Sequence, residues 1–246
     1  MALETAPIVD DRLPDRVDAV FLDAGGVLVT PDPDRVRAEL AAAVPGAATP
    51  DDAALVQAHY RAMAAVDVAR SAPETFDAYL PAYLGAIGHD GAAALAAARS
   101  LWSVPYRLWT RPLPGAADAL AALAASGRPV VVVSNADGRV AEALATVLQV
   151  GPGAGVEVTA VVDSGVVGID KPDPAIFHLA LDAAATALGR DVDPGRVVHV
   201  GDAHGYDVAG ARAAGVVPVF VDPLGLHPAP GCPVVGSLTE VVDLLG

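Results

Sequence analysis

The residues of this sequence that could carry out chemistry stand where apolar segments end. They are Asp23, Ser134 with Asn135, Lys171, and Asp202 with Asp207. Carboxylates are ligands that Mg²⁺ accepts readily, and a carboxylate can also attack phosphorus as a nucleophile. Lys171 is the only lysine of the chain, so chemistry that needs a primary amine has one side chain available. Each residue alone could be a helix cap, a turn former or a surface charge, so only their combination indicates a functional site.

Five valine-rich apolar runs predict the strands that position these residues. They cover residues 18–23, 129–133, 156–162, 197–200 and 216–221. The runs are continuous rather than alternating, which is typical of strands buried on both faces and therefore of a parallel sheet. Each run ends in polar or charged residues, and doubly wound sheets bind ligands at the carboxyl ends of their strands. The sequence predicts an α/β fold, a doubly wound Rossmann-like parallel sheet.

Helical segments separate these strands, and their ends carry capping signals. Residues 114–126 form one such segment. Asp173, followed by a proline, predicts the start of another helix, and Gly189 predicts its end. Ser237 and Glu240 have the spacing of a capping box and predict the start of the last helix.

The segment between Pro31 and Arg111 departs from the alternation of strands and helices. It contains no convincing strand and predicts helices over residues 34–43, 50–69, 73–86 and 91–109. We therefore expect residues 32–111 to form a helical cap inserted into a core. Residues 1–31 and 112–246 would form that core. Prolines at residues 30–33 and 110–114 predict hinges at the two crossings.

Two stretches of the sequence are specific enough to indicate a family. They read K-P-D-P-x-I-F from Lys171 to Phe177 and V-G-D-x-x-x-x-D-V-x-G-A-x-x-A-G from Val200 to Gly215. Taken in order with Asp23 and with Ser134 and its neighbour, they resemble the four motifs of the haloacid dehalogenase (HAD) superfamily. The helical insertion resembles the C1-type cap of that superfamily. The resemblance extends over nearly the whole chain beyond residue 17.

The resemblance implies a Mg²⁺-dependent phosphohydrolase acting on a small phosphorylated metabolite. Asp23 would be the nucleophile and form an aspartyl-phosphate. Ser134 and the amide of Asn135 would donate hydrogen bonds to the phosphoryl oxygens, and Lys171 would offset the charge between nucleophile and phosphate. The resemblance further implies that Mg²⁺ is held by Asp23, the backbone carbonyl of Gly25, Asp202 and Asp207.

Gly25 departs from the family pattern, because phosphatases of this superfamily carry a second aspartate there as general acid and base. General acid catalysis contributes about 10²–10⁴ in rate. A catalytically impaired HAD-fold protein that binds a ligand is therefore an alternative. Haloacid dehalogenation is a second alternative, although Asp202 and Asp207 favour a metal. A glycine at this position also allows a positive φ, which would oppose an aspartate there.

Other side chains could supply the missing proton or contact the substrate. His204 lies between the two aspartates of the last motif, and histidine titrates near neutral pH. The cap offers further candidates, which are Tyr60, Arg61, Arg70, Tyr106 and Arg107.

Composition restricts the partners of the protein. The 246 residues include 30 acidic and 15 basic side chains, giving a net charge of −15, which argues against nucleic acid as a partner. No apolar run approaches the length of a membrane helix, and the acidic N-terminus is not typical of a secretory signal. A single cysteine excludes an internal disulfide. We expect a cytoplasmic protein, and the sequence does not indicate its oligomeric state.

Overall fold

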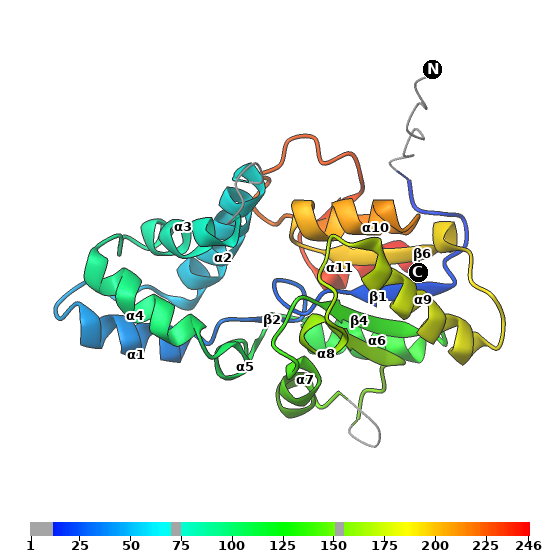
Figure 1. The fold of residues 1–246 in the computed structure, drawn as a ribbon, viewed down its shortest axis with the longest axis horizontal. Helices are drawn as coiled ribbons and strands as arrows, with labels where there is room; N and C mark the ends of the chain where they lie inside the picture. Colours follow the sequence, from blue (N-terminus) through cyan, green and yellow to red (C-terminus); the bar gives the residue numbers. More distant parts are fainter. Residues whose placement is uncertain (1–11, 70–74, 151–154) are drawn as a thin grey trace.

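A parallel sheet forms the centre of one of two lobes (Figure 1). The computed structural model describes residues 12–69, 75–150 and 155–246. Six strands have the order β5-β4-β1-β6-β7-β8 and pair in parallel throughout. They are β1 (Ala19–Leu22), β4 (Val130–Ser134), β5 (Ala160–Asp163), β6 (Val197–Gly201), β7 (Val217–Val221) and β8 (Val234–Val235). The predicted fold class is confirmed, whereas β5 begins at Ala160 rather than at residue 156, and the short β8 was not predicted.

Helices cover both faces of the sheet, as a doubly wound fold requires. One face packs against α6 (Ala116–Ala125), α7 (Val140–Leu148) and α11 (Leu238–Leu245), and the other against α9 (Pro174–Leu188) and α10 (Ala209–Ala213). Within β1, Val20 faces the first set of helices and Phe21 the second, because successive side chains of a strand point to opposite faces. Two short elements, α8 (Ser164–Val167) and η2 (Pro194–Arg196), complete this lobe with the η3 segment described below.

The predicted capping interactions form in α9 but not in α11. The Asp173 side chain accepts a hydrogen bond from the backbone N–H of Ala175 at 2.9 Å, and Gly189 ends α9 with a φ of 64°. Ser237 is the N-cap of α11 but makes no side-chain capping hydrogen bond. Instead, Glu240 accepts from the backbone N–H of Gly236 at 2.9 Å. Because Gly236 precedes the N-cap, neither hydrogen bond of the predicted capping box is formed.

The second lobe is helical. It contains α1 (Pro33–Ala43), α2 (Asp52–Val68), η1 (Thr75–Ala78), α3 (Tyr79–Ala86), α4 (Ala92–Trp102) and α5 (Pro105–Leu108). The prediction of one helix over 91–109 is wrong, because Pro105 lacks an N–H and starts a separate short helix. The predicted helix start at residue 73 lies outside the described residues. Buried tyrosines and leucines give this lobe a core of its own.

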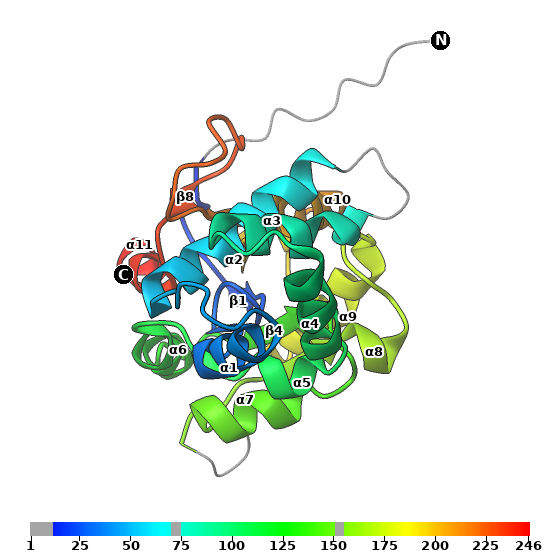
Figure 2. The same cartoon turned by 90° about the vertical axis from the view of Figure 1, so that its left-hand side faces the viewer.

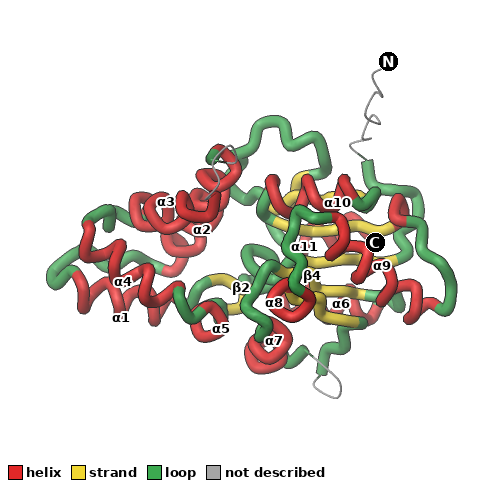
Figure 3. Tube along the Cα trace, in the orientation of Figure 1, coloured by secondary structure: helices red, strands yellow, loops and turns green. Residues whose placement is uncertain are grey.

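Two short strands form the crossings between the lobes. β2 (Val29–Thr30) pairs antiparallel with β3 (Arg111–Pro112), which the sequence did not predict. The expected hinge segments therefore lie side by side as a two-stranded ribbon, visible as the short strand labelled β2 between the helical lobe and the sheet (Figure 3). Seen from the side of the helical lobe, helices α1 to α4 lie in front of β1 and β4 (Figure 2).

No helix within residues 12–69, 75–150 and 155–246 is long and apolar enough to span a membrane.

Candidate active site

The loop after β1 places Asp23 at the floor of a cavity between the two lobes. The backbone N–H of Ala24 donates to Asp23 Oδ1 at 2.7 Å, which fixes the carboxylate. The side chain of Asp23 is 13% exposed. Gly26 has a φ of 68°, and a Cβ at this position would collide with the Asp202 carboxylate. The turn therefore requires glycine at position 26, and this turn allows the loop to approach Asp202 closely.

Lys171 is buried and joins two of the predicted site carboxylates. Its Nζ lies 2.9 Å from Asp23 Oδ1 and 2.7 Å from Asp207 Oδ1, and it donates to the carbonyl of Val133 at 3.0 Å. Asn135 positions the lysine through two hydrogen bonds. Its side chain accepts from the N–H of Lys171 at 2.7 Å and donates to the carbonyl of Lys171 at 3.0 Å. The strand-end asparagine thus orients the backbone that carries the site lysine.

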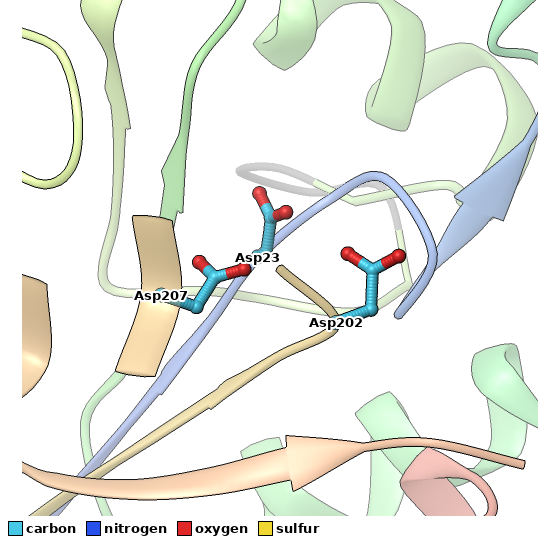
Figure 4. A group of neighbouring side chains, drawn as sticks. All are labelled: Asp23, Asp202 and Asp207. Atoms are coloured by element: carbon cyan, nitrogen blue, oxygen red, sulfur yellow. The ribbon is translucent and has the colours of Figure 1, made fainter. Parts of the chain in front are cut away.

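The last motif supplies two carboxylates from the segment after β6. Asp207 lies on η3 (His204–Val208) and accepts hydrogen bonds from the N–H of Ala203 at 3.0 Å and from His199 Nε2 at 2.9 Å. One carboxylate oxygen of Asp207, one of Asp202 and one of Asp23 lie within 4.8 Å of one another. Figure 4 shows Asp207 and Asp202 on either side of Asp23. The structure therefore brings the three predicted metal-binding carboxylates together.

Burial and neighbouring charges shift the pKa values of the ionisable groups in this cluster. Burial, opposed by Lys171 but reinforced by Asp207 and Asp202, raises the pKa of Asp23 to about 7. Burial would also raise the pKa of Asp207, but Lys171 and the hydrogen bond from His199 outweigh it and hold this pKa below its usual value. Burial raises the pKa of Asp202 despite its His59 partner. The lysine has its pKa raised by the two carboxylates, against the effect of burial, and stays charged.

The helical lobe closes the cavity above the carboxylates. The cavity has a volume of about 570 Å³ and is lined by Asp23, Ser134 and Lys171 on the core side and by Met63 and Tyr106 on the side of the insertion. Residues from both lobes thus face one space.

Some of the other predicted contacts lie elsewhere. Tyr60 donates to the carbonyl of Gly26 at 2.9 Å and supports the loop after Asp23 instead of lining the cavity. Arg61 and Arg107 are exposed and do not line it either, and Arg70 lies outside the described residues. His204 contacts the carbonyl of Pro230 through Nε2 at 3.1 Å and is also absent from the cavity wall, which argues against its role as a proton donor.

Gly25 lines the cavity, and a neighbouring ring occupies the space that a side chain would need. Its φ lies outside the left-handed region, so the expected backbone obstacle to an aspartate is not present. A Cβ on Gly25 would instead lie 3.1 Å from Cζ3 of Trp109. The place of the usual general acid is thus next to an indole ring.

Two residues of α2 that the sequence did not single out reach the core. His59 Nε2 lies 2.8 Å from Asp202 Oδ2, and its Nδ1 lies 2.8 Å from the hydroxyl of Tyr79. Because a carboxylate only accepts, Nε2 carries the proton and Nδ1 can accept from the tyrosine. Asp67 accepts from the N–H groups of His204 at 3.1 Å and Gly205 at 2.7 Å. A buried histidine and an aspartate within a helix gave no local signal of these distant contacts.

Comparisons with known proteins agree with the motifs and the fold. The family model of the haloacid dehalogenase-like hydrolases matches residues 17–215. A phosphoserine phosphatase of Thermus thermophilus is 46% identical over 79 residues, which cover 32% of this chain and 29% of that protein. The bovine haloacid dehalogenase-like hydrolase domain-containing protein 3 is 36% identical over 118 residues, or 48% of this chain and 43% of that protein. The matched part spans less than half the length of either relative.

Solved structures share the architecture at lower identity. The HAD hydrolase YfnB of Bacillus subtilis, bound to magnesium, has a TM-score of 0.63 at 15% identity, covering 94% of this chain and 100% of that one. A HAD phosphatase from Thermococcus onnurineus has a TM-score of 0.55 at 21% identity, covering 94% and 98%. A dehalogenase has a TM-score of 0.58 at 22% identity, covering 95% and 99%. These likenesses show the fold, and the family model covers most of the chain: the protein belongs to the haloacid dehalogenase-like hydrolases.

Proposed function

We propose that this hydrolase is a Mg²⁺-dependent phosphohydrolase of a small phosphorylated metabolite, with Asp23 as its nucleophile. The observation that carries the proposal is the cluster of Asp23, Asp202 and Asp207 around the single buried amine of Lys171. Local similarity to a phosphoserine phosphatase supports phosphate ester hydrolysis, and the carboxylates of Asp202 and Asp207 favour a metal-dependent reaction over dehalogenation.

The donor set fits a magnesium ion. Three carboxylates face one ammonium group, so the cluster has surplus negative charge that a divalent cation would neutralise. Mg²⁺ prefers oxygen ligands, and the chain offers Asp23, Asp202, Asp207 and the carbonyl of Gly25 as predicted ligands. The ion, when bound, would neutralise charge on the phosphoryl oxygens during transfer. YfnB, solved with magnesium, supports this assignment.

The residues of the chain divide the reaction into two displacements. A carboxylate oxygen of Asp23 forms a bond to phosphorus while the bond between phosphorus and the leaving oxygen breaks, and water then attacks phosphorus and releases phosphate from Asp23. Lys171 favours the ionised form of the nucleophile, whose pKa burial raises, and offsets the charge of the incoming phosphate. Ser134 and the N–H of Asn135 donate to phosphoryl oxygens. Because position 25 carries no acid, the leaving group must take its proton from water or depart without one.

A screen of phosphorylated metabolites with and without Mg²⁺ tests the proposal. Turnover that requires Mg²⁺, together with phosphate trapped on Asp23 and identified by mass spectrometry, is the expected result. Gly25 and the indole beside it favour one competing candidate, a catalytically impaired protein that binds its ligand. Saturable ligand binding without turnover of any substrate would establish that alternative.

The first mutational prediction concerns the metal. Asp202→Asn removes a charge from the cluster but keeps an oxygen that can accept from His59, so the fold should remain intact. We expect kcat/KM at limiting Mg²⁺ to fall by at least about 10²-fold, with weaker Mg²⁺ binding in titration calorimetry. The control is Asp182→Asn, an exposed aspartate on α9. Wild-type activity in excess chelator would contradict both the metal and the function.

The second prediction concerns Gly25. Wild-type activity should fall steeply as the pKa of the leaving alcohol rises, because no side chain at position 25 donates a proton. Gly25→Asp alone should change this little, since the Trp109 ring lies 3.1 Å from the new Cβ. Combining it with Trp109→Ala should raise alkyl phosphate turnover by about 10²-fold. The Trp109→Ala variant is the control. An equal gain from Gly25→Asp alone would show that the ring is no obstacle.

A further inference from the structure

We propose that the substrate carries its phosphate on an uncharged, planar, apolar group, as in an aryl phosphate. The inference rests on the proposed phosphohydrolase function and concerns the part of the cavity beyond Asp23. It follows from the cavity walls, from the distribution of cations around them and from the neighbourhood of Gly25.

The walls of the cavity away from the carboxylates are mainly apolar. The helical insertion contributes Met63, Trp102 and Tyr106, and helix α7 contributes Val140 and Leu144. Small-molecule sites of this size are typically lined by apolar and aromatic side chains, with a few polar groups that fix orientation. The site carboxylates and Lys171 gather at one end, and Asp137 and Asp170 are the other charged side chains of the lining, so the remainder of a substrate meets mainly aromatic rings and aliphatic side chains.

The cavity offers no cation to a second anionic group. Lys171 is the one lysine or arginine among the described residues that line it, and two of the three site carboxylates, Asp23 and Asp207, already engage its amine. Neither arginine beside Tyr106 lines the cavity: Arg139 stacks on the Tyr106 ring at 3.7 Å and pairs with Glu142 at 2.7 Å, and Arg107 lies over the same ring at 5.5 Å. A carboxylate or second phosphate on the substrate would thus be desolvated without a partner.

Acidic side chains on the same wall would add repulsion. Asp137 and Asp170 line the cavity and are exposed. An anionic substituent held near them would meet like charges at short range, which is unfavourable. Sugar bisphosphates and phosphorylated carboxylic acids therefore fit this cavity poorly.

Aromatic rings lie beside the position of the leaving oxygen. Trp109 covers Gly25, and its ring packs edge-on against His59 with centroids 5.2 Å apart. Arg139 holds Tyr106 from the outside by its stacking contact. Rings held in this way favour a flat apolar partner by edge or offset stacking. A phenolic leaving group also departs readily without a proton donor, which matches the glycine at position 25.

Two substrates with phenols of similar acidity test the inference. They are 2-naphthyl phosphate, which is uncharged beyond its phosphate, and 4-carboxyphenyl phosphate. Acetyl phosphate, which is small and has a good leaving group, reports on phosphoryl transfer alone. With Mg²⁺ present, we expect kcat/KM for the naphthyl ester to exceed that for the carboxylated ester by about 10- to 100-fold.

Variants of the aromatic wall locate the preference. Tyr106→Ala, and separately Trp102→Ala, should lower the ratio of kcat/KM for the naphthyl ester to that for acetyl phosphate by about tenfold. Val68→Ala, at an exposed position of the insertion that does not line the cavity, is the control and should leave the ratio unchanged. Circular dichroism checks that each variant is folded. A lowered ratio in one folded wall variant supports the inference.

The outcomes separate the inference from the function on which it rests. Turnover of acetyl phosphate with equal rates for both aryl esters, or a preference for the carboxylated one, would overturn the substrate class and keep the phosphohydrolase. An unchanged ratio in both folded wall variants would also overturn the substrate class and keep the phosphohydrolase. Absence of turnover for all three compounds would overturn the proposed function and the inference together.

Discussion

Asp23→Asn is expected to abolish turnover while preserving the fold. The asparagine keeps an oxygen that can accept from the N–H of Ala24 and from Lys171, but it cannot form a stable acyl phosphate. Removal of a nucleophile from other enzymes lowers kcat by about 10⁶-fold, and we expect a loss of about 10⁴- to 10⁶-fold here. Single-turnover assays with radiolabelled phosphate measure the residual rate, and no label should remain on the variant.

The same substitution should stabilise the metal-free protein. The pKa of Asp23 is raised from 3.8 to about 7 by burial and by the neighbouring carboxylates, so the ionised form costs stability. With a raised carboxyl pKa, the folded state loses stability as pH rises from about 4 to 7 and carries the full penalty above pH 7. In chelator at pH 8, urea denaturation should show a gain of about 1–3 kcal/mol in Asp23→Asn. A variant less stable than wild type under these conditions would show that the ionised Asp23 carboxylate does not destabilise the metal-free protein.

Lys171→Met is expected to remove both activity and stability. It leaves Asp207 and Asp23 without their shared ammonium partner, and breaking a buried ion pair in this way costs about 3–5 kcal/mol. The pKa of Lys171 is raised, so its stabilising charge is fully present below the unfolded value of 10.5, including at neutral pH. Urea denaturation at pH 7.5 measures the loss.

An exposed ion pair provides the matched control. Arg111 lies 3.0 Å from Asp34, and both side chains are exposed, so Arg111→Met should cost less than about 1 kcal/mol. If Lys171→Met does not fold, Lys171→Arg retains the charge and should fold with impaired activity, because the guanidinium group is wider than the amine. A fully active, fully stable Lys171→Met would contradict the role of the lysine.

The sequence predicted the sheet and the positions of its polar ends because both depend on local patterns. Buried parallel strands are continuous apolar runs, and their carboxyl ends meet at one edge, so Asp23, Ser134 and Asp202 could be placed together from spacing alone. Their roles remain predictions. The start of β5 depended on pairing instead. The N–H of Thr159 donates to the carbonyl of Val130, the first residue of β4, whereas Val156 before it forms only an isolated bridge with Val150.

Contacts between distant segments could not be read from the sequence. The contact of His59 with Asp202 spans 143 positions, and a histidine within a helix looks like any other helix residue. The same holds for the Trp109 ring over Gly25, which depends on how the insertion folds back. The ribbon of β2 and β3 is too short for a two-residue period to be recognised.

Helix α2 is attached to the core at several points, and this affects how the lobes can separate. His59 and Asp67 are eight positions apart, or about 12 Å along the helix, and both bind the segment that follows β6, while Tyr60 binds the carbonyl of Gly26. While one attachment holds, the others are kept at a high effective concentration of their partners and rebind quickly. Loss of a single attachment is therefore followed by rebinding, and the lobes part only when all the attachments are open at the same time. Opening should then follow a single exponential, and weakening any one attachment should accelerate the whole motion rather than loosen one end of the helix.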